Sequence, residues 1–336
     1  MIKQAIKNTN VLVIQPLPGI GDTIWHLPHL KAIAANTFSQ QITLLTKRRS
    51  LARDLLAGTN YIKEVLYLSE IKNRHKGIFG GWRLGSDLKP YHFDETWILH
   101  GSTRYGIAAS HAGIKDRFGY GIGWQNAFLT SPYSLSRGDK FLGTIEKATR
   151  CLELNGIPFY EKTPCLRLTE KAIKSAEILL HKSHRKTIGF AIGSSELSKQ
   201  WGSKKFISLI RAIRGKHDVQ IVLLGGPSDT DIANLIAKSF SFSPWLKQVI
   251  GRPILEAAAV TSLCEICIGN DTGILNIAAA TGTISIGLFG ASSPQNRNPF
   301  ITAIVPSEIR IKSENGMDMI TPAEVLKLIY NISSFQ

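Results

Sequence analysis

The residues with the clearest chemical potential stand in GNDTGILNIAAATG, residues 269–282. Asp271, Thr272 and Gly273 separate a short apolar run from small residues with a helical pattern. The first backbone N–H groups of a helix have no partner and its dipole is positive there, so an anion such as a phosphate binds well. A carboxylate at this place can instead cap the helix. The segment predicts either a phosphate site or an ordinary helix start.

A second segment, QPLPGIGDTIWHLPHLKAI, occupies residues 15–33. Gly19 and Gly21 permit a tight turn and a close approach of a ligand, and Asp22 follows them where a helical pattern begins. A carboxylate there could act as a general base on a sugar hydroxyl, or it could cap the helix. A dinucleotide-binding fingerprint fits less well because the third glycine is absent.

A third segment, AIGSSELSKQWGSKKF, covers residues 191–206. Ser194 and Ser195 offer hydroxyls and backbone amides, and Lys199 offers a positive charge for a departing diphosphate. Two later segments add Asp229 as a contact for a nucleotide base or ribose and Arg297 as a contact for a phosphate. Ordinary polar loops and turns are the alternative at each of these places.

The elements that must position these residues follow a repeated pattern of short apolar runs and helical stretches. Strands are expected at residues 11–15, 42–46, 64–68, 96–100, 187–193, 220–226, 267–270 and 284–290. Strands that are apolar throughout and separated by helices are typical of parallel sheets covered on both faces. We therefore expect two doubly wound α/β domains. Ligands bind at the carboxyl ends of such strands, where the three segments lie.

The expected domains comprise residues 1–168 and 186–336, with residues 169–185 as a linker that contains a bridging helix at 170–180. The net charge is +15, of which +10 lies in residues 1–168, so the partner should be anionic. No nucleic-acid-binding motif is recognisable, which favours a lipid-linked or phosphate-bearing partner. No run of about 20 apolar residues and no secretory signal are present, so we expect a cytoplasmic protein.

Two further features have simple alternatives. Cys264 and Cys267 form a C-x-x-C pair without a second ligand pair nearby, so we interpret them as buried thiols and predict no metal site. Residues 71–90 mix basic with apolar side chains: Lys72, Arg74, Lys76, Arg83, Lys89, Ile78, Phe79 and Trp82. That stretch could contact a lipid headgroup region, cover an anionic acceptor, or form a solvated loop.

Taken together, GIGDTIWHLPHLKAI, SSELSKQW and GNDTGILNIAAATGTISIGLFGASSP resemble glycosyltransferase family 9, which includes the ADP-heptose:lipopolysaccharide heptosyltransferases. Weaker agreement in FDETWILHGSTRYGIAASHAGIKDRFGYG and ITPAEVLKLI extends the resemblance over almost the whole chain. It implies a GT-B fold, with two Rossmann-like domains facing across a cleft. Residues 1–168 would bind the acceptor and residues 186–336 the nucleotide sugar, and transfer would be inverting and metal-independent, without a cofactor.

The resemblance also implies roles for individual residues. Asp22 would be the catalytic base, and Gly19, Gly21 and Arg104 would lie at the acceptor. The donor would be bound by Ser194, Ser195, Lys199, Asp271, Thr272, Gly273 and Asn276. Family members usually have His at the position of Asn276, and Asn can donate a hydrogen bond but cannot carry a proton or a positive charge.

The expected function is transfer of a sugar, heptose from ADP-heptose, to a lipopolysaccharide core-type acceptor, with peripheral association with an anionic inner membrane and no role for nucleic acid. Two alternatives keep the fold. One is a protein that binds a nucleotide or glycan without transferase activity, which the Asn276 departure suggests. The other is a transferase or epimerase that acts on a different nucleotide sugar.

Overall fold

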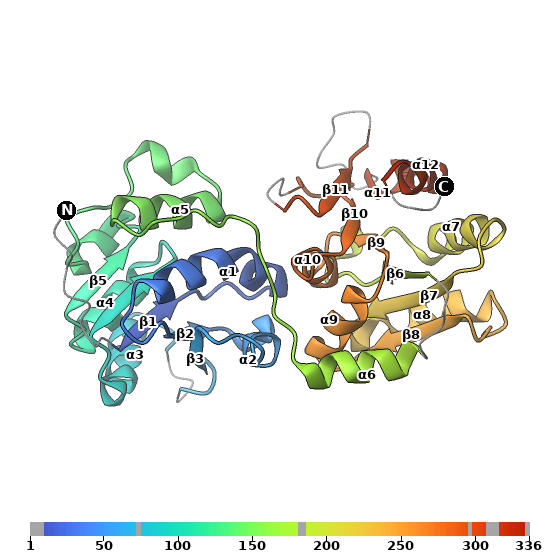
Figure 1. Cartoon of the computed structure of the whole chain (residues 1–336). Helices are drawn as coiled ribbons and strands as arrows, with labels where there is room; N and C mark the ends of the chain where they lie inside the picture. The colour runs from blue at the N-terminus through green and yellow to red at the C-terminus, as the bar shows by residue number, and fades with distance from the viewer. Residues whose placement is uncertain (1–9, 72–74, 181–185, 295–297, 307–315, 333–336) are drawn as a thin grey trace. The chain divides into compact units, whose positions relative to one another are not determined.

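The computed structural model describes residues 10–71, 75–180, 186–294, 298–306 and 316–332. The chain divides into two compact units, Met1–Pro164 and Cys165–Gln336. Each unit contains one parallel sheet with helices packed against it (Figure 1). The prediction of two doubly wound α/β domains is therefore confirmed.

The first unit is built on a five-stranded sheet in the order β3-β2-β1-β4-β5. Its strands are β1 (Val11–Ile14), β2 (Ile42–Thr46), β3 (Ile62–Tyr67), β4 (Glu95–Ile98) and β5 (Asp116–Gly119). The central strand β1 and its neighbour β2 are buried along their whole length, which explains their unbroken apolar character. β2 pairs with one side of β1 and β4 pairs with the other side, so the topological switch point lies between β1 and β4.

The helices of the first unit are α1 (Ile20–Ala35), α2 (Ala52–Leu55), α3 (Gly80–Leu88), α4 (Thr103–His111) and α5 (Thr144–Leu154). Leu84 and Leu88 of α3 and Ala108 of α4 pack with Leu12 and Ile14 of β1 in one buried cluster. These two helices therefore cover one face of the sheet.

The second unit has a six-stranded sheet in the order β11-β10-β9-β6-β7-β8. Its strands are β6 (Thr187–Ala191), β7 (Gln220–Gly225), β8 (Leu246–Ile250), β9 (Ile266–Asn270), β10 (Ile284–Leu288) and β11 (Ile301–Ile304). β6 pairs with β7 on one side and with β9 on the other, so the switch point lies between β6 and β9.

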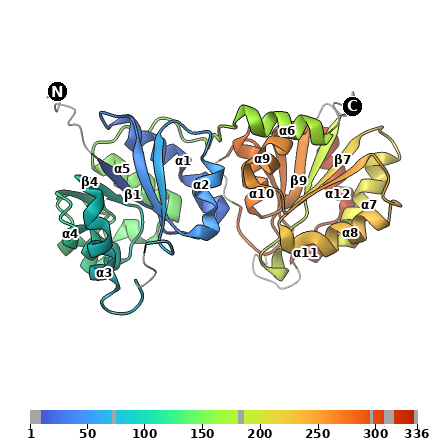
Figure 2. The ribbon, with the colours of Figure 1, turned by 90° about the horizontal axis from the view of Figure 1, so that it is seen from below.

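Helices cover both faces of this sheet (Figure 2). They are α6 (Glu170–Leu180), α7 (Ser203–Arg214), α8 (Thr230–Lys238), α9 (Ile254–Ser262), α10 (Gly273–Ala280), α11 (Gly316–Met319) and α12 (Pro322–Ile332). Phe190 of β6 faces α7, α8 and α12, whereas Ala191, the next residue, faces α6, α9 and α10. Successive strand residues thus contribute to two separate cores, as the alternation of a strand requires.

Three strands were not predicted from the sequence, and each lies at the edge of a sheet. β5 has the polar sequence DRFG, β8 is partly exposed, and β11 is half-buried along its whole length. An edge strand has a neighbour on one side only and packs less apolar surface, so it does not show the continuous apolar run of a central strand.

The helix predicted at residues 170–180 is present as α6, but its packing differs from that of a linker. Ala172, Ala176 and Leu180 are buried in the core of the second unit, together with residues of α9. The helix therefore forms part of that unit, and only residues 181–185 of the expected linker lie outside the described ranges.

This packing predicts a large effect for one substitution in α6 and a small effect for another. Leu180→Ala should lower the free energy of unfolding of the second unit by about 2 to 4 kcal/mol because it leaves a cavity in a packed core. Ile178→Ala is the matched control, since the Ile178 side chain is 72% exposed. Denaturant unfolding of the whole chain measures both, and equal small effects would contradict the assignment of α6 to the core.

Candidate functional site

The carboxyl ends of β6 and β9 bring two of the three chemically promising segments together. The loop that follows β6 contains Ser194 and Lys199, and the loop that follows β9 contains Asp271 and Thr272. Since β6 and β9 are hydrogen-bonded neighbours at the switch point, both loops begin at the same edge of the sheet. This is the usual position of a ligand site in a doubly wound sheet.

Asn270, the last residue of β9, connects the two loops and was not predicted as a functional residue. Its Nδ2 donates to the carbonyl oxygens of Ile192 at 2.9 Å and Gly193 at 3.1 Å and to Gln200 Oε1 at 2.6 Å. Its Oδ1 accepts the backbone N–H of Trp201 at 3.1 Å. The side chain is fully buried, so these bonds form in a medium without competing water. An amide at the end of an otherwise apolar strand was the available sequence signal.

Lys199 is held in this loop by two carboxylates. Its Nζ lies 3.3 Å from Asp271 Oδ2 and 3.1 Å from Glu196 Oε1. Burial lowers the pKa of the Lys199 ammonium, but the negative charges of Asp271 and Glu196 raise it by more, and the net pKa lies above the usual value. The group is therefore a permanent cation at neutral pH, placed beside the start of α10.

The start of α10 is not capped by its N-cap residue. The Thr272 side chain accepts no hydrogen bond from the first backbone N–H groups, and no other side-chain oxygen of the described residues accepts one. Asp271 Oδ2 instead accepts the Ser292 hydroxyl at 2.7 Å and pairs with Lys199. Of the two interpretations of this segment, the ordinary carboxylate cap is absent, and a helix start with unused N–H donors is present.

Thr272 and Asn276 complete this turn of the helix. Asn276 Nδ2 donates to the Thr272 carbonyl oxygen at 2.9 Å, so the side chain that replaces the usual family His is turned back onto its own helix. The Thr272 hydroxyl is buried and has no hydrogen-bond partner among the residues that the structure describes. Gly273 is the first residue of α10 and adds no side chain in front of the helix start.

The first part of the β6 loop is fixed by Asp229. Its carboxylate accepts the backbone N–H groups of Gly226, at 2.7 Å, and Ser194, and burial raises the pKa of the carboxyl. A Cβ at Gly193 would lie 2.0 Å from Asp229 Oδ2, so only glycine fits there. Asp229 therefore positions the loop, and its carboxylate is already engaged by the backbone. Ser194 donates to the Glu196 carbonyl oxygen at 2.8 Å, and Ser195 is exposed.

In the first unit, Asp22 occupies the first turn of α1, after the carboxyl end of β1. Its Oδ2 accepts the backbone N–H of Gly19 at 3.0 Å, so the helix-capping interpretation is observed here. The residue is half-buried, and Oδ1 has no partner in the described ranges. Capping and proton transfer are compatible, because one oxygen can hold the turn while the other faces a substrate.

His26 reinforces this turn and was not predicted. Its Nδ1 donates to the Asp22 carbonyl oxygen at 2.6 Å, and the imidazole is fully buried. Burial lowers the pKa of His26, which favours the neutral ring. Because the Asp22 carbonyl oxygen only accepts, the proton of the neutral ring lies on Nδ1.

Further polar groups gather at the carboxyl ends of β2 and β4. His100 Nδ1 accepts the backbone N–H of Ser102 at 3.0 Å, and burial, with a smaller effect of Lys47, lowers the pKa of His100. The buried Gln125 donates to the carbonyl oxygens of His100 at 2.7 Å and Ser102 at 3.1 Å. Arg104 is exposed in the first turn of α4. This edge of the sheet therefore combines fixed loops with positive charge.

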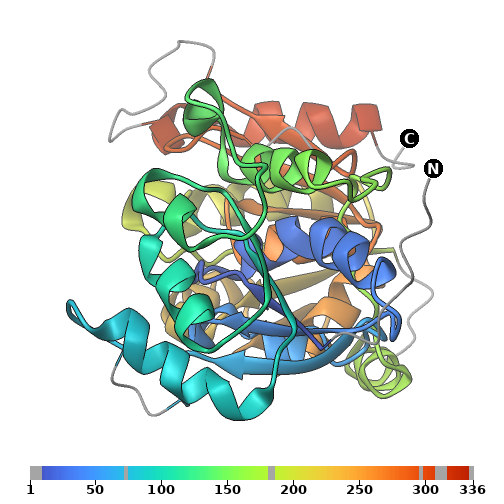
Figure 3. The same ribbon diagram turned by 90° about the vertical axis from the view of Figure 1, so that its left-hand side faces the viewer.

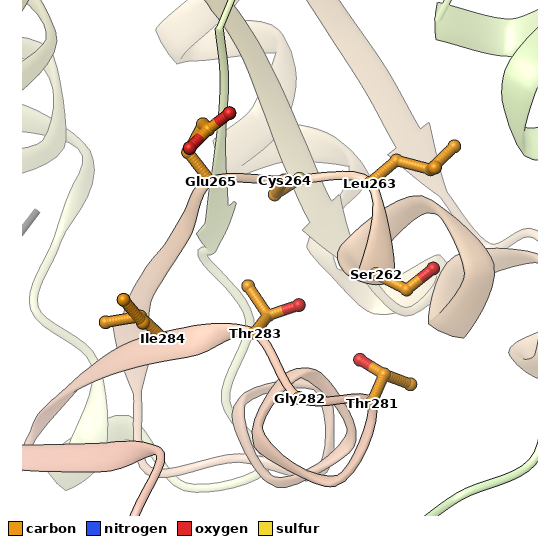
Figure 4. A pocket seen from close by; sticks show the side chains of 8 residues that line it. All are labelled: Ser262, Leu263, Cys264, Glu265, Thr281, Gly282, Thr283 and Ile284. Atoms are coloured by element: carbon orange, nitrogen blue, oxygen red, sulfur yellow. The ribbon is translucent and has the colours of Figure 1, made fainter. Parts of the chain in front are cut away.

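A shallow depression of about 330 Å³ lies at the opposite edge of the second sheet (Figure 4). Its lining precedes β9 and β10, so it is at the amino ends of these strands. The hydroxyls of Ser262, Thr281 and Thr283 donate to main-chain carbonyl oxygens of Ala259, Ala278 and Thr261. Because these protons are used within the protein, we place the candidate site at the carboxyl edge instead.

Four observations concern the other sequence predictions. Cys151, Cys264 and Cys267 are buried free thiols, and burial raises the pKa of Cys267 to about 12. No cluster of three or more His, Cys, Asp or Glu suited to a metal ion occurs within the described ranges. No helix in those ranges is long and apolar enough to cross a membrane. Arg297 lies outside the described residues.

The buried amide of Asn270 predicts a large effect of a small change. Asn270→Ala should lower the free energy of unfolding by about 3 kcal/mol, because two buried carbonyl oxygens and one buried N–H lose their partner. The backbone N–H of Trp201 should also lose protection from hydrogen exchange. Ser195→Ala, in the exposed part of the same loop, is the control. Unchanged stability and protection in Asn270→Ala would rule out the anchoring role.

Comparison with known proteins gives a consistent result. The model of glycosyltransferase family 9 (heptosyltransferase) matches residues 82–315. Lipopolysaccharide heptosyltransferase 2 of Salmonella typhimurium is 25% identical over 230 residues, and the match covers 65% of this chain and 65% of that protein. The Escherichia coli protein of the same name is 23% identical over 229 residues, again with 65% of each chain. The chain thus spans 65% of the length of these curated relatives.

Solved structures show the same fold. Escherichia coli ADP-heptose lipopolysaccharide heptosyltransferase II superposes with a TM-score of 0.76 at 20% identity, covering 96% of this chain and 98% of that one. A family 9 glycosyl transferase from Veillonella parvula gives 0.79 at 19% identity, covering 97% of each chain. The family match includes both the loop anchored by Asn270 and the uncapped start of α10. The chain therefore belongs to glycosyltransferase family 9.

Proposed function

We propose that the protein is an inverting, metal-independent glycosyltransferase that transfers heptose from ADP-heptose to a lipopolysaccharide core-type acceptor at the cytoplasmic face of the inner membrane. The observation that carries this proposal is the pairing of Lys199 with Asp271 beside the uncapped start of α10. A cation and a row of unused N–H donors at one place suit a diphosphate leaving group.

On the donor side, the amides of Thr272 and Gly273 would bind the diphosphate, and Lys199 would neutralise the charge that develops on it. Ser194 and Ser195 would contact the same phosphates from the loop after β6. Asp271 would hold a hydroxyl of the transferred sugar through Oδ1, because Oδ2 is already bonded to Ser292 and Lys199. Stabilising the leaving group in this way needs fixed donors, and Asn270 holds the loop that carries Lys199.

On the acceptor side, Asp22 would act as general base. The acceptor hydroxyl would give its proton to the Asp22 carboxylate as its oxygen forms a bond to the anomeric carbon. The bond from that carbon to the diphosphate oxygen would break, and its electron pair would leave with the nucleoside diphosphate. Gly19 and Gly21 would allow the sugar to approach the turn, and Arg104 would attract the phosphates and acidic sugars of the acceptor.

Support for heptose and ADP comes from the two curated relatives named lipopolysaccharide heptosyltransferase 2 and from the similar ADP-heptose lipopolysaccharide heptosyltransferase II structure. The curated relatives are 25% and 23% identical, and they support sugar transfer as the class of reaction. Asn276 bonds to its own helix and cannot carry a charge, which favours the alternative of a nucleotide-binding or glycan-binding protein without transferase activity. A transferase or epimerase for another nucleotide sugar is the remaining alternative.

Removal of the Lys199 charge tests the donor site. Lys199→Ala should weaken binding of ADP and ADP-heptose about tenfold or more, because a charge-assisted hydrogen bond to phosphate is lost. Thermal shift over a range of nucleotide concentrations measures this affinity. Lys204→Ala removes an exposed cation from the adjacent helix α7 and is the control. Equal stabilisation of both variants by ADP would contradict the assigned role of Lys199.

Replacement of the Asp22 carboxylate tests the catalytic base. Asp22→Asn should lower kcat by about 10² to 10⁴-fold while leaving donor affinity nearly unchanged, because an amide cannot accept the acceptor proton. Asn can still accept the Gly19 N–H, so the turn should remain folded. Initial rates with ADP-heptose and a lipopolysaccharide core acceptor provide the measurement. Turnover close to the native rate would remove Asp22 from this role.

A further inference from the structure

Residues 75–83, which we name the α3 tip, present an unusual apolar surface. The exposed fractions are 88% for Ile78, 62% for Phe79 and 44% for Trp82. The Phe79 and Trp82 rings lie 6.1 Å apart between centroids and thus form one continuous surface. Figure 3 shows α3 at the periphery of the first unit. Single exposed apolar residues are common, but three within five positions call for a partner.

The exposure is not caused by a lack of packing partners for α3. The opposite side of this helix is already buried against α4, where a Cβ at Gly81 would come 3.0 Å from the Arg104 carbonyl oxygen and one at Gly85 2.6 Å from that of Ala108. Leu84 and Leu88 are buried in the core of the unit. The aromatic side chains therefore occupy the free side of a helix whose packing side is complete.

The tip is also held in place. His75 Nε2 lies 3.1 Å from Asp87 Oδ2, and both side chains are almost fully buried. A Cβ at Gly80 would lie 2.0 Å from the His75 carbonyl oxygen, so the backbone folds tightly onto the start of α3. Because His75 contacts the start of α3, the loop between them is closed. Ile78 and Phe79 in this loop therefore stay exposed and do not pack against the protein.

The exposed charged side chains within residues 75–92 are positive. Lys76, Arg83 and Lys89 are exposed, whereas Asp87, the acidic residue of the range 75–92, is buried in its pair with His75. Lysine is depleted in protein–protein interfaces, whereas apolar side chains flanked by Lys and Arg suit the boundary between lipid headgroups and acyl chains. Each cation near an anionic bilayer adds to the attraction.

We propose that the α3 tip docks the protein on a bilayer that contains anionic lipids, with Ile78, Phe79 and Trp82 inserted among the headgroups and Lys76, Arg83 and Lys89 against the lipid phosphates. The Arg104 Nε lies 3.5 Å from the Cβ position of Gly80, so the tip adjoins the first turn of α4. If the proposed function is correct, this arrangement places a lipid-linked acceptor beside Arg104. The docking surface itself does not depend on the transfer reaction.

Vesicle binding tests the proposal directly. The full chain should co-sediment with vesicles of phosphatidylcholine and phosphatidylglycerol and bind weakly to vesicles of phosphatidylcholine alone. Phe79→Ser should weaken binding to the anionic vesicles about tenfold, because the inserted ring is lost. Phe141→Ser is the matched control, since Phe141 is 91% exposed in the first unit within another short turn, Gly138–Phe141. Neither exposed ring packs in the core, so both variants should have the same thermal unfolding midpoint as the native protein.

Tryptophan fluorescence provides a second measurement. The native protein should show a shift of emission to shorter wavelength on anionic vesicles, and Trp82→Phe should lose most of that shift while still binding. Absence of binding to anionic vesicles, or equal loss in Phe79→Ser and Phe141→Ser, would overturn the proposal. Binding of a delipidated acidic oligosaccharide that Phe79→Ser abolishes, without vesicle binding, would assign the tip to the acceptor glycan. No donor is present in these assays, so their failure would remove the membrane site from the proposed function but leave the transfer reaction standing.

Discussion

The hydrogen bonds of Asn270 are the constraint on which the candidate donor site depends. A single buried amide joins the end of β9 to the loop after β6, and this loop carries Lys199. Parallel strands bring their carboxyl ends to one edge, but they do not fix the loops that leave it. The amide supplies that connection in a region where water cannot compete for the same groups. The loop that carries Lys199 is thereby held at the end of β9, where the segment leading to α10 begins.

The acidic residues at the starts of α1 and α10 have different hydrogen-bond partners. At the start of α1, the Asp22 carboxylate caps the turn, and the buried His26 donates a hydrogen bond to the Asp22 carbonyl oxygen of the same turn. At the start of α10, the corresponding acidic residue, Asp271, is drawn away to Lys199 and Ser292, and the helix start keeps its N–H groups for another partner. An anion is therefore favoured at α10, whereas Asp22 is itself the anion at α1.

Much of the fold was predictable from sequence, because central strands such as β1 and β6 are apolar throughout and are separated by helical patterns. The edge strands and the packing of α6 were not predictable, since they depend on neighbours distant in sequence. The same distinction holds for the site. Lys199 and Asp271 were recognised as types of residue, but their pairing, and the anchoring by Asn270 across 70 positions, exist only in three dimensions.

A crystal structure of the protein with ADP would show whether a nucleoside diphosphate binds between Lys199 and the start of α10. We expect phosphate oxygens within hydrogen-bond distance of Lys199 Nζ and of the Thr272 or Gly273 amide, with the Asn270 hydrogen bonds unchanged. ADP bound at another place, with the start of α10 unoccupied at saturating nucleotide, would contradict this binding mode.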